Sequence, residues 1–510
     1  MKKIWGLLAC CILIVTLANG QGINRELFIK DSLDLYISKA LTNWRIPGMA
    51  ICIIKDGKIV VLKGYGIKEL GLNGRVDENS LFMIGSNTKA FTATAMAMLQ
   101  TAGKLSLDDK VTRYIPEFKL DNKTAGEQAT IRDLLCHRIG FGTFQGDFTF
   151  YNTNLTQGQV IQKMALVKAD NPFRAKWGYT NSAYTVASQI IEWADGKTWD
   201  AYLKQNIFDP LGMTNTLALS RDIQTRANRT VAHTLVDGRL TAIPYVRLDG
   251  TDAAGGICSS ARDMSKWVMC LLDDGKAMGK QVIPEVAIQV TRQPQITIGN
   301  TRRLDGETDE QKYGLGWFLE DYSGHHLVMH DGGVNGYLSS VTLVPAEHLG
   351  IIILTNTDKN QLYEALRWEI MDAYFNKPYR NYSELYLQRY KVAEAKKQQA
   401  DKLLRDSAAM NLQSAIAIEN YTGKYHNELY GDMEVTRGEG NDLEMRFEHH
   451  TKMYVHLKPL GGNRFYAVFS DPAYGKTVVP FTFQNGKITG VKIKVDDEIE
   501  RSPYFFTKLN

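Results

Sequence analysis

A serine and a lysine stand three positions apart in the segment Ser86-Asn87-Thr88-Lys89, where an Ala- and Met-rich pattern predicts a helix to Ala102. Residues three apart share a helix face, so the lysine amine returns to the serine hydroxyl. A serine hydroxyl is a weak nucleophile until a base takes its proton, and a lysine does this once burial lowers its pKa. The pattern indicates acyl transfer through Ser86 and Lys89; the alternative is an N-cap serine beside a solvated lysine.

A second polar group, Tyr179-Thr180-Asn181, lies just before a helix expected from Ser182 to Ala194. A phenol or phenolate there could share proton transfer with Lys89, and Asn181 could hold the substrate amide or the lysine. The Tyr-x-Asn spacing recurs elsewhere in the chain, so this spacing alone does not select a site.

A third group, His330-Asp331-Gly332-Gly333, is expected to open a strand that continues to Val344. The glycines leave room for a substrate backbone along the strand edge, where a backbone N–H could join that of Ser86 in an oxyanion hole. A carboxylate at position 331 that faces the acyl site would repel substrates with a carboxylate in the leaving group. The alternative is a tight turn with an ordinary surface histidine, and an Asp331 paired with a surface cation.

Composition and charge restrict the classes of function. The 510 residues carry a formal net charge of +4, which provides no electrostatic footprint for nucleic acid. No Gly-x-Ser-x-Gly segment occurs, which disfavours an α/β-hydrolase. The pairs His325-His326 and His449-His450 lack partners at ligand spacing, so we expect neither a metal nor a cofactor. We interpret the later cysteines as buried thiols, with one bridge left open: Cys52, Cys136, Cys258 and Cys270.

Residues 1–20 have the pattern of a signal peptide. Lys2 and Lys3 precede an apolar run, and small residues follow it near Gly20. The run is shorter than the ~20 residues that a spanning helix needs. We therefore expect an exported protein, periplasmic or secreted, with no transmembrane segment in the mature chain. A lipoprotein anchored at Cys10 is the alternative, but the apolar run continues well past that cysteine.

The elements that must position these groups lie in residues 21–378. Strand patterns at 50–61, 337–344 and 350–354 flank a region of helical patches. One antiparallel sheet covered by helices, with an inserted helical region, accommodates this order. The predicted class is therefore α+β, an α-β sandwich.

The chain changes character after residue 378. Residues 379–413 are polar and Lys-rich, which predicts a solvated linker helix with few contacts crossing it. From 414 to 510, strands of period two separated by Gly-rich turns predict a small antiparallel barrel or sandwich.

The order Ser-x-x-Lys, Tyr-x-Asn, His-x-Gly resembles that of the β-lactamase-related serine hydrolases, which include class C β-lactamases and D-amino-acid peptidases, over roughly residues 30–375. Flanking stretches carry the resemblance further: Ile46-Pro47-Gly48-Met49, Leu105-Ser106-Leu107-Asp108-Asp109, Ile131-Arg132-Asp133-Leu134-Leu135, Ala254-Gly255-Gly256 and Tyr313-Gly314-Leu315-Gly316-Trp317. The C-terminal strands resemble the lipocalin-like barrel appended to some members.

The resemblance implies a β-lactamase/transpeptidase-like domain and assigns roles. Ser86 takes the place of the nucleophile, Lys89 of its activating partner, and Tyr179 of the general acid/base. The substrate-binding positions are Asn181, His330, Asp331, Gly332 and Gly333, with the N–H groups of Ser86 and Gly333 in the oxyanion hole. Two departures stand out: dedicated class C β-lactamases carry Lys-Thr-Gly at the third motif, and a hydroxyl residue commonly occupies the place of Asp331.

We therefore expect a serine hydrolase or acyltransferase that acts on an ester or amide: an esterase, a D-amino-acid peptidase or an alcohol-accepting acyltransferase, with weak β-lactamase activity. Its partners would be a small-molecule or peptide acyl donor and, for transfer, an alcohol. The alternative is a penicillin-binding sensor that deacylates slowly or not at all. Its barrel would bind glycan or peptide through aromatic residues such as Tyr430 and Phe447.

Overall fold

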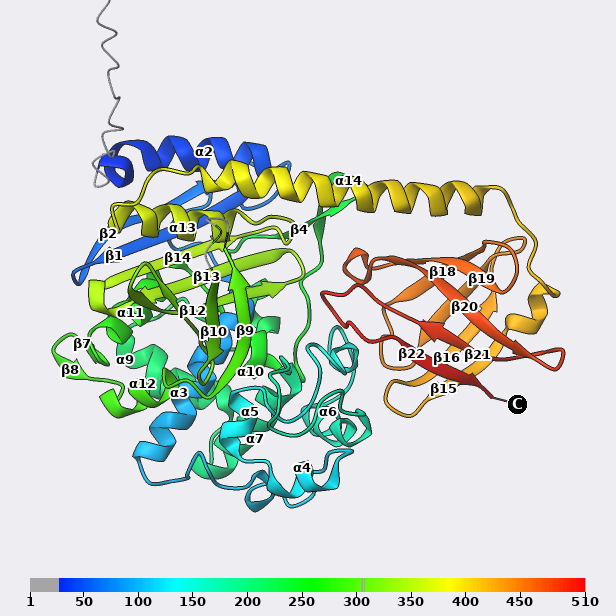
Figure 1. Cartoon of the computed structure of the whole chain (residues 1–510), viewed down its shortest axis with the longest axis horizontal. Coiled ribbons are helices and arrows are strands. Elements are labelled where there is room, and N and C mark those ends of the chain that lie inside the picture. Colours follow the sequence, from blue (N-terminus) through cyan, green and yellow to red (C-terminus); the bar gives the residue numbers. More distant parts are fainter. Residues whose placement is uncertain (1–26, 304–305, 307, 510) are drawn as a thin grey trace, which may run out of the picture.

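The computed structural model describes residues 27–303, 306 and 308–509. It has a sheet-and-helix part and a separate barrel, which the long helix α14 (Tyr382–Ala409) connects (Figure 1). The expected α+β class followed by a small all-β barrel is confirmed. The expected signal peptide and Cys10 lie outside the described residues.

An eight-stranded antiparallel sheet forms the centre of the first part, in the order β2-β1-β14-β13-β12-β11-β10-β9. Its strands are β1 (Gly48–Lys55), β2 (Lys58–Gly66), β9 (Ile296–Arg302), β10 (Thr308–Tyr313), β11 (Phe318–Tyr322), β12 (His325–Val334), β13 (Tyr337–Val344) and β14 (Leu349–Thr355). All residues of β14 are buried, because helices cover both faces of the sheet there.

The third motif lies differently from the sequence expectation. His330 does not open one long strand: it lies inside β12, and Asn335-Gly336 turns the chain into β13. Asn-Gly is a strong hairpin signal because both positions tolerate positive φ, and Gly336 has φ 80°. The hairpin places residues 330–334 on a strand paired with β13, with the turn directly after the motif.

Alternating side chains of the sheet enter two cores. Met49, Ile51 and Ile53 of β1 pack under α2 (Leu33–Trp44) and α13 (Leu362–Tyr374) on one face. Ala50, Cys52 and Ile54 face the other core, which contains the remaining helices. These helices are α3 (Thr88–Thr101), α4 (Lys123–Gln128), α5 (Ile131–Leu135), α6 (Gln157–Lys163), α7 (Asn181–Asp195), α8 (Trp199–Leu203), α9 (Asp209–Leu211), α10 (Asp252–Gly255), α11 (Ala261–Leu272) and α12 (Glu285–Thr291).

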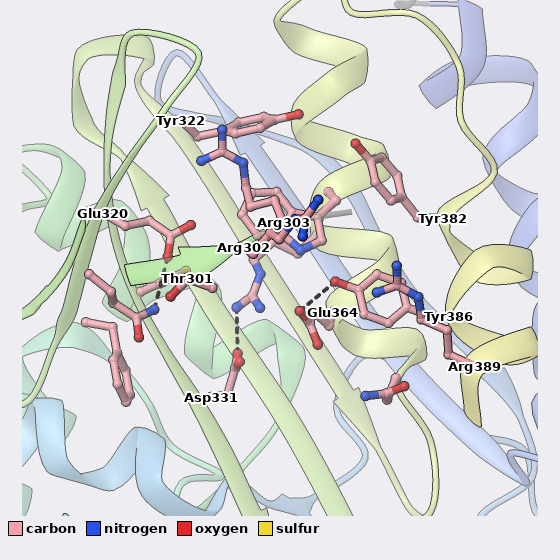
Figure 2. A pocket seen from close by; sticks show the side chains of 16 residues that line it. Thr301, Arg302, Arg303, Glu320, Tyr322, Asp331, Glu364, Tyr382, Tyr386 and Arg389 are labelled. Carbon is pink, nitrogen blue, oxygen red and sulfur yellow. Dashed lines mark hydrogen bonds and ion pairs between the residues drawn. The ribbon is translucent and has the colours of Figure 1, made fainter. Parts of the chain in front are cut away.

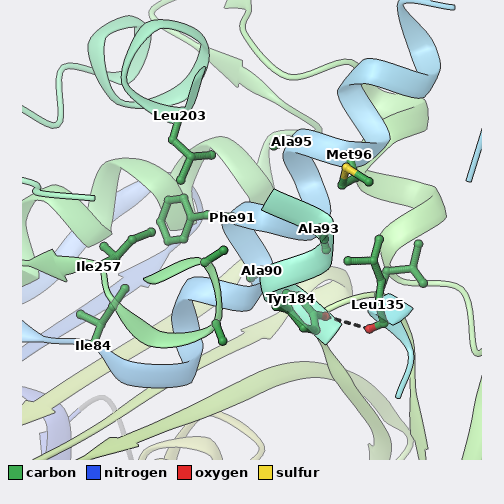
Figure 3. Packing of buried hydrophobic residues seen from close by; sticks show 14 of the residues in the cluster. Ile84, Ala90, Phe91, Ala93, Ala95, Met96, Leu135, Tyr184, Leu203 and Ile257 are labelled. Atoms are coloured by element: carbon green, nitrogen blue, oxygen red, sulfur yellow. Dashed lines mark hydrogen bonds between the residues drawn. The ribbon is translucent and has the colours of Figure 1, made fainter. Parts of the chain in front are cut away.

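Helix α3, which follows Ser86, is buried almost all round. Figure 3 shows Phe91 and its alanine neighbours packed among side chains of several other elements. Phe91 also stacks on Trp267, with ring centroids 4.1 Å apart. Small alanines let the neighbouring helices approach, and Gly103, with φ 69°, lies directly beyond the helix end. The expected helix is confirmed.

The C-terminal part is a closed eight-stranded barrel. Its strands are β15 (Gly423–Asn427), β16 (Gly431–Arg437), β17 (Leu443–Phe447), β18 (Tyr454–Pro459), β19 (Arg464–Phe469), β20 (Lys476–Gln484), β21 (Lys487–Ile493) and β22 (Tyr504–Lys508). Tyr430 and Phe447, which we considered as glycan- or peptide-binding residues of a sensor, are buried in its packed core.

The expectation of few contacts between the two parts is wrong. Residues 146–154 of the first part run against the barrel: the Asn154 N–H donates to His449 O (3.0 Å), and the Tyr474 hydroxyl donates to Tyr151 O (2.9 Å). The polar composition of the linker indicates only that the linker itself is solvated. It carries no information on the contacts that a distant segment makes with the barrel. Within the described ranges, no helix combines the length and apolarity needed to cross a bilayer. The four cysteines there are free and buried.

Candidate active site

Ser86 lies in a short 3₁₀ turn, Gly85–Asn87, that leads into α3 and presses against β12. Gly85 has φ 51°, and a Cβ there would stand 2.8 Å from Gly333 N. A Cβ on Gly332 would stand only 1.9 Å from Ile84 O. The two glycines therefore allow the turn and the strand to approach, which brings the half-buried Ser86 beside the third motif.

Lys89 is fully buried, and its amine contacts three oxygens. Its Nζ lies 3.0 Å from Ser86 Oγ, 2.6 Å from Asn181 Oδ1 and 2.8 Å from Ala254 O on α10. The amide and carbonyl oxygens only accept hydrogen bonds. A neutral amine would donate its two N–H groups to them and turn its lone pair toward the Ser86 hydroxyl.

Burial lowers the pKa of Lys89 well below its usual range, while the Asp147 carboxyl partly opposes this effect. The amine also lies over the Tyr179 ring, 4.6 Å from its centroid. Geometry and pKa together make Lys89 able to accept the Ser86 proton.

Tyr179 lies in the irregular segment before α7 and is buried. Burial raises the pKa of its phenol well above 10, and hydrogen bonding to Ser86 offsets only part of this rise. The resting side chain is therefore a neutral phenol rather than the phenolate considered from the sequence. The His137 ring packs against it at 4.4 Å between centroids, and His137 Nδ1 accepts the Thr180 N–H at 3.0 Å.

Asn181, the first residue of α7, is oriented by a residue that the sequence analysis missed. Its Nδ2 donates to Asp147 Oδ2 at 2.6 Å, so its Oδ1 faces Lys89. Asp147 is fully buried, and burial raises its pKa well above the usual value. No motif marks this aspartate, since it lies in a turn 34 residues upstream of Asn181.

His330 is buried, and both of its ring nitrogens have partners. Nδ1 lies 2.6 Å from Asp331 O, which can only accept, so Nδ1 carries the proton. Nε2 then accepts from the Tyr313 hydroxyl at 3.0 Å. Burial lowers the pKa of His330 to about 3. The histidine is thus neutral and links β12 to Tyr313, the last residue of β10.

Asp331 points to the opposite face of the sheet, as strand alternation requires. Its Oδ1 accepts from Nη1 of Arg367 on α13 at 2.8 Å, and Arg367 is only 4% exposed. Asp331 lines a cavity of about 420 Å³ between β9–β12 and the helices α13 and α14. Figure 2 shows its side chain among the others that line this cavity. Arg367 balances the charge of Asp331, so the repulsion of substrate expected from an unpaired carboxylate does not apply.

Gly332 and Gly333 lie where one side of β12 has no strand partner. The pairing with β11 ends at Met329, opposite Phe318, whereas β13 continues along the other side. Beyond Met329, the free side of β12 borders a cleft of about 810 Å³. This cleft is lined by Ser86, Tyr179, Asn181, His330, Gly332 and Gly333, and Asp331 borders both this cleft and the cavity beside Arg367. The structure therefore brings every predicted site residue except the buried Lys89 to the cleft wall.

The barrel also contributes to the cleft wall, through Ala473, Glu498, Ile499 and Arg501. Glu498 forms an ion pair with Lys359 at 3.0 Å across the two parts, and the Arg501 guanidinium lies 5.4 Å from the Phe144 ring centroid. Sequence reasoning had no signal for these residues, because the barrel resemblance carried no role.

Comparison with protein families divides the chain as the fold does. Residues 33–375, more than half of the chain, match the family model described as Beta-lactamase. Residues 410–508 match a domain of unknown function, DUF3471.

Similar proteins include two enzymes named unguisins hydrolase. That of Aspergillus violaceofuscus is 28% identical over 341 residues, which are 63% of this chain and 60% of that protein. That of Aspergillus campestris is 26% identical over 432 residues, covering 80% and 78%. The chain therefore spans less than two thirds of the first hydrolase.

Solved structures share the fold. A penicillin-binding protein homologue from Pyrococcus abyssi, described as octameric, has a TM-score of 0.58 and 21% identity over 93% of this chain and 99% of its own. A D-stereospecific amidohydrolase from Streptomyces has a TM-score of 0.52 and 21% identity, covering 64% and 94%.

Proposed function

This chain belongs to the beta-lactamase family, and we propose that it is a serine hydrolase or acyltransferase that works through an acyl-Ser86 intermediate. One observation carries the proposal: a fully buried Lys89 amine lies 3.0 Å from the Ser86 hydroxyl, with its two other contacts on oxygens that only accept. This arrangement directs a basic lone pair at a nucleophile that is accessible from the cleft.

In the first half-reaction, Ser86 Oγ attacks the carbonyl carbon of an ester or amide while Lys89 Nζ takes the hydroxyl proton. The N–H groups of Ser86 and Gly333 stabilise the oxyanion. As the bond to the leaving group breaks, the Tyr179 phenol relays a proton to the leaving oxygen or nitrogen and is reprotonated from Lys89.

In the second half-reaction, water or an alcohol attacks the acyl carbon. Its proton passes to Lys89 directly or through Tyr179, and Ser86 Oγ leaves as the restored hydroxyl. Water gives hydrolysis, and an alcohol gives a new ester. The open cleft admits either acceptor, so the same residues serve both reactions.

Support for the substrate class comes from the site and from the relatives. The Arg367–Asp331 pair removes the electrostatic objection to leaving groups with a carboxylate. The name unguisins hydrolase favours hydrolysis, and the name D-stereospecific amidohydrolase favours an amide as the bond that is hydrolysed. We propose amide and ester hydrolysis as the principal activity, in an exported protein.

The test is a screen of purified protein against esters, D-amino-acid amides and a chromogenic cephalosporin, each with and without an alcohol acceptor. Turnover of at least one class by wild type, and none by Ser86→Ala, is the expected result. Recovery after a covalent probe separates an enzyme from a slowly deacylating sensor: an enzyme regains free Ser86, whereas a sensor stays labelled. The absence of any acyl-Ser86 with every substrate would reject the proposal.

A further inference from the structure

The barrel forms hydrogen bonds with the turn that contains Asp147. Glu500, in the connection between β21 and β22, accepts the Gly146 N–H at Oε1 (2.8 Å) and the Phe148 N–H at Oε2 (3.0 Å). The Tyr430 hydroxyl donates to Oε1 at 2.7 Å and holds the carboxyl group in place. The backbone N–H groups of the two residues on either side of Asp147 are therefore both bound by one carboxyl group of the other part.

Phe148 fixes the same turn by packing. Its side chain is fully buried and belongs to the core of the barrel rather than to that of its own part. The ring lies between His450 and Tyr504, nearly parallel to both, with centroids 4.0 Å and 5.4 Å away. Because this ring is buried in the barrel core, the turn cannot leave the barrel without exposing an apolar aromatic side chain to water.

A short chain of hydrogen bonds connects the turn held by the barrel to the nucleophile. Asp147 Oδ2 accepts from Asn181 Nδ2 at 2.6 Å, and Asn181 Oδ1 accepts from Lys89 Nζ at 2.6 Å. If Asp147 moved away, the Asn181 amide could rotate and present its N–H₂ group to the amine. Lys89 would then lose an acceptor, and its lone pair would no longer be directed at Ser86.

We propose that Glu500 and Phe148 are positioning residues for acyl transfer, through which the C-terminal barrel fixes Asp147, Asn181 and finally the Lys89 amine. The inference rests on the proposed function. It assigns the barrel a role inside the reaction: the site is incomplete without it, although the barrel supplies none of the three motifs.

The experiment measures the rate of Ser86 labelling by a fluorophosphonate as a function of pH, on full-length protein. The isosteric substitution Glu500→Gln replaces one accepting carboxylate oxygen by an N–H₂ donor. This donor faces a backbone N–H, so the hydrogen bond between them is lost. Phe148→Leu keeps an apolar side chain but loses the ring stack. We expect each to lower the labelling rate about 10–100-fold and to shift the apparent pKa of the pH profile, because Lys89 loses its fixed acceptor.

Matched controls separate positioning from general damage. Glu444→Gln removes another barrel carboxylate, whose partner is the exposed Arg446, and Phe505→Ala removes an exposed barrel aromatic. Both should label as wild type does. Backbone hydrogen exchange at residues 146–149 should be faster than in wild type in Glu500→Gln, but not in Glu444→Gln.

A double-mutant cycle gives the sharpest outcome. Because Glu500 acts through Asp147, adding Glu500→Gln to Asp147→Asn should cost little beyond Asp147→Asn alone. Additive losses, or a folded Glu500→Gln with the wild-type rate and pH profile, would overturn the inference while leaving the proposed function intact. A wild-type protein that never labels at Ser86 would instead reject the proposed function, and this inference with it.

Discussion

At the scale of single residues, Lys89 carries the most chemistry because three features coincide on one side chain. It is buried, its amine touches the Ser86 hydroxyl, and its remaining contacts are acceptors. Each feature alone is common in structural lysines. General-base catalysis needs a neutral amine at working pH. Burial provides it by lowering the pKa of Lys89.

Lys89→Met should therefore slow acylation severely with little change in fold. Loss of the base should reduce the labelling rate by about 10²–10⁴-fold. Stability at neutral pH should stay equal or rise, since an apolar side chain replaces a buried amine. In wild type, the rate should increase with pH through the Lys89 pKa and level off below pH 10.5, its ordinary value. Rates from pH 5 to 10 and thermal unfolding of both proteins check this; wild-type labelling by Lys89→Met would refute the assignment.

Asp331 gives a second prediction at this scale. Because Arg367 balances its charge, substrates with a free carboxylate in the leaving group and their amidated counterparts should differ by less than about tenfold in kcat/KM, not by the thousandfold expected from an unpaired carboxylate. Asp331→Asn leaves the Arg367 charge less balanced, so it should shift this ratio toward the carboxylate substrates by no more than about tenfold. It should also destabilise the protein by about 1–3 kcal/mol, because Arg367 loses this ionic partner. A kcat/KM ratio that changes strongly in Asp331→Asn would mean that the Asp331 carboxylate acts directly on the substrate.

At the scale of elements, the contact between the Ser86 turn and β12 determines whether the motifs meet. Gly85 needs both its positive φ and its lack of a Cβ, whereas Gly103 has φ 69° with nothing within 4 Å of its Cβ position. Gly85→Ala should thus lose most activity and stability. Gly103→Ala should lose only about 1 kcal/mol and keep its activity. Comparable losses in the two variants would show that backbone strain alone, rather than the clash with β12, limits position 85.

Sequence reasoning predicted the elements with strong periodicity and the motif residues on them. The buried run of β14, the Ala-rich α3 and the alternating barrel strands follow from local patterns, and their existence is confirmed. The β12–β13 turn was missed although Asn335-Gly336 signals it. Asp147 and Glu500 could not be found, because their importance arises from contacts between segments 354 residues apart.

At the scale of the whole molecule, Glu500 makes the junction between the two parts sensitive to pH. Burial raises the pKa of Glu500 to about 7 from an ordinary value of 4.5. A raised pKa in the folded state means that the folded protein binds the proton more tightly than the unfolded protein does. The contribution of this proton to the free energy of unfolding is therefore fully present below pH 4.5 and is lost as pH rises through 7.

Glu500→Gln cannot titrate at this position. The stability of wild type relative to Glu500→Gln should therefore decline between pH 4.5 and 7, by an amount on the order of 2 kcal/mol. Urea unfolding of both proteins at several pH values measures the difference. A difference that is constant across this range would mean that Glu500 has the same pKa in the folded and unfolded states.

The most direct measurement is the site of covalent modification. Full-length protein is treated with a fluorophosphonate, and the modified peptide is identified by mass spectrometry in wild type and in Ser86→Ala. We predict a single stoichiometric adduct on Ser86 in wild type, and none in a Ser86→Ala protein with unchanged circular dichroism, because the other site residues act only through this hydroxyl. An adduct on a different residue, or equal labelling of Ser86→Ala, would contradict an acyl-Ser86 mechanism.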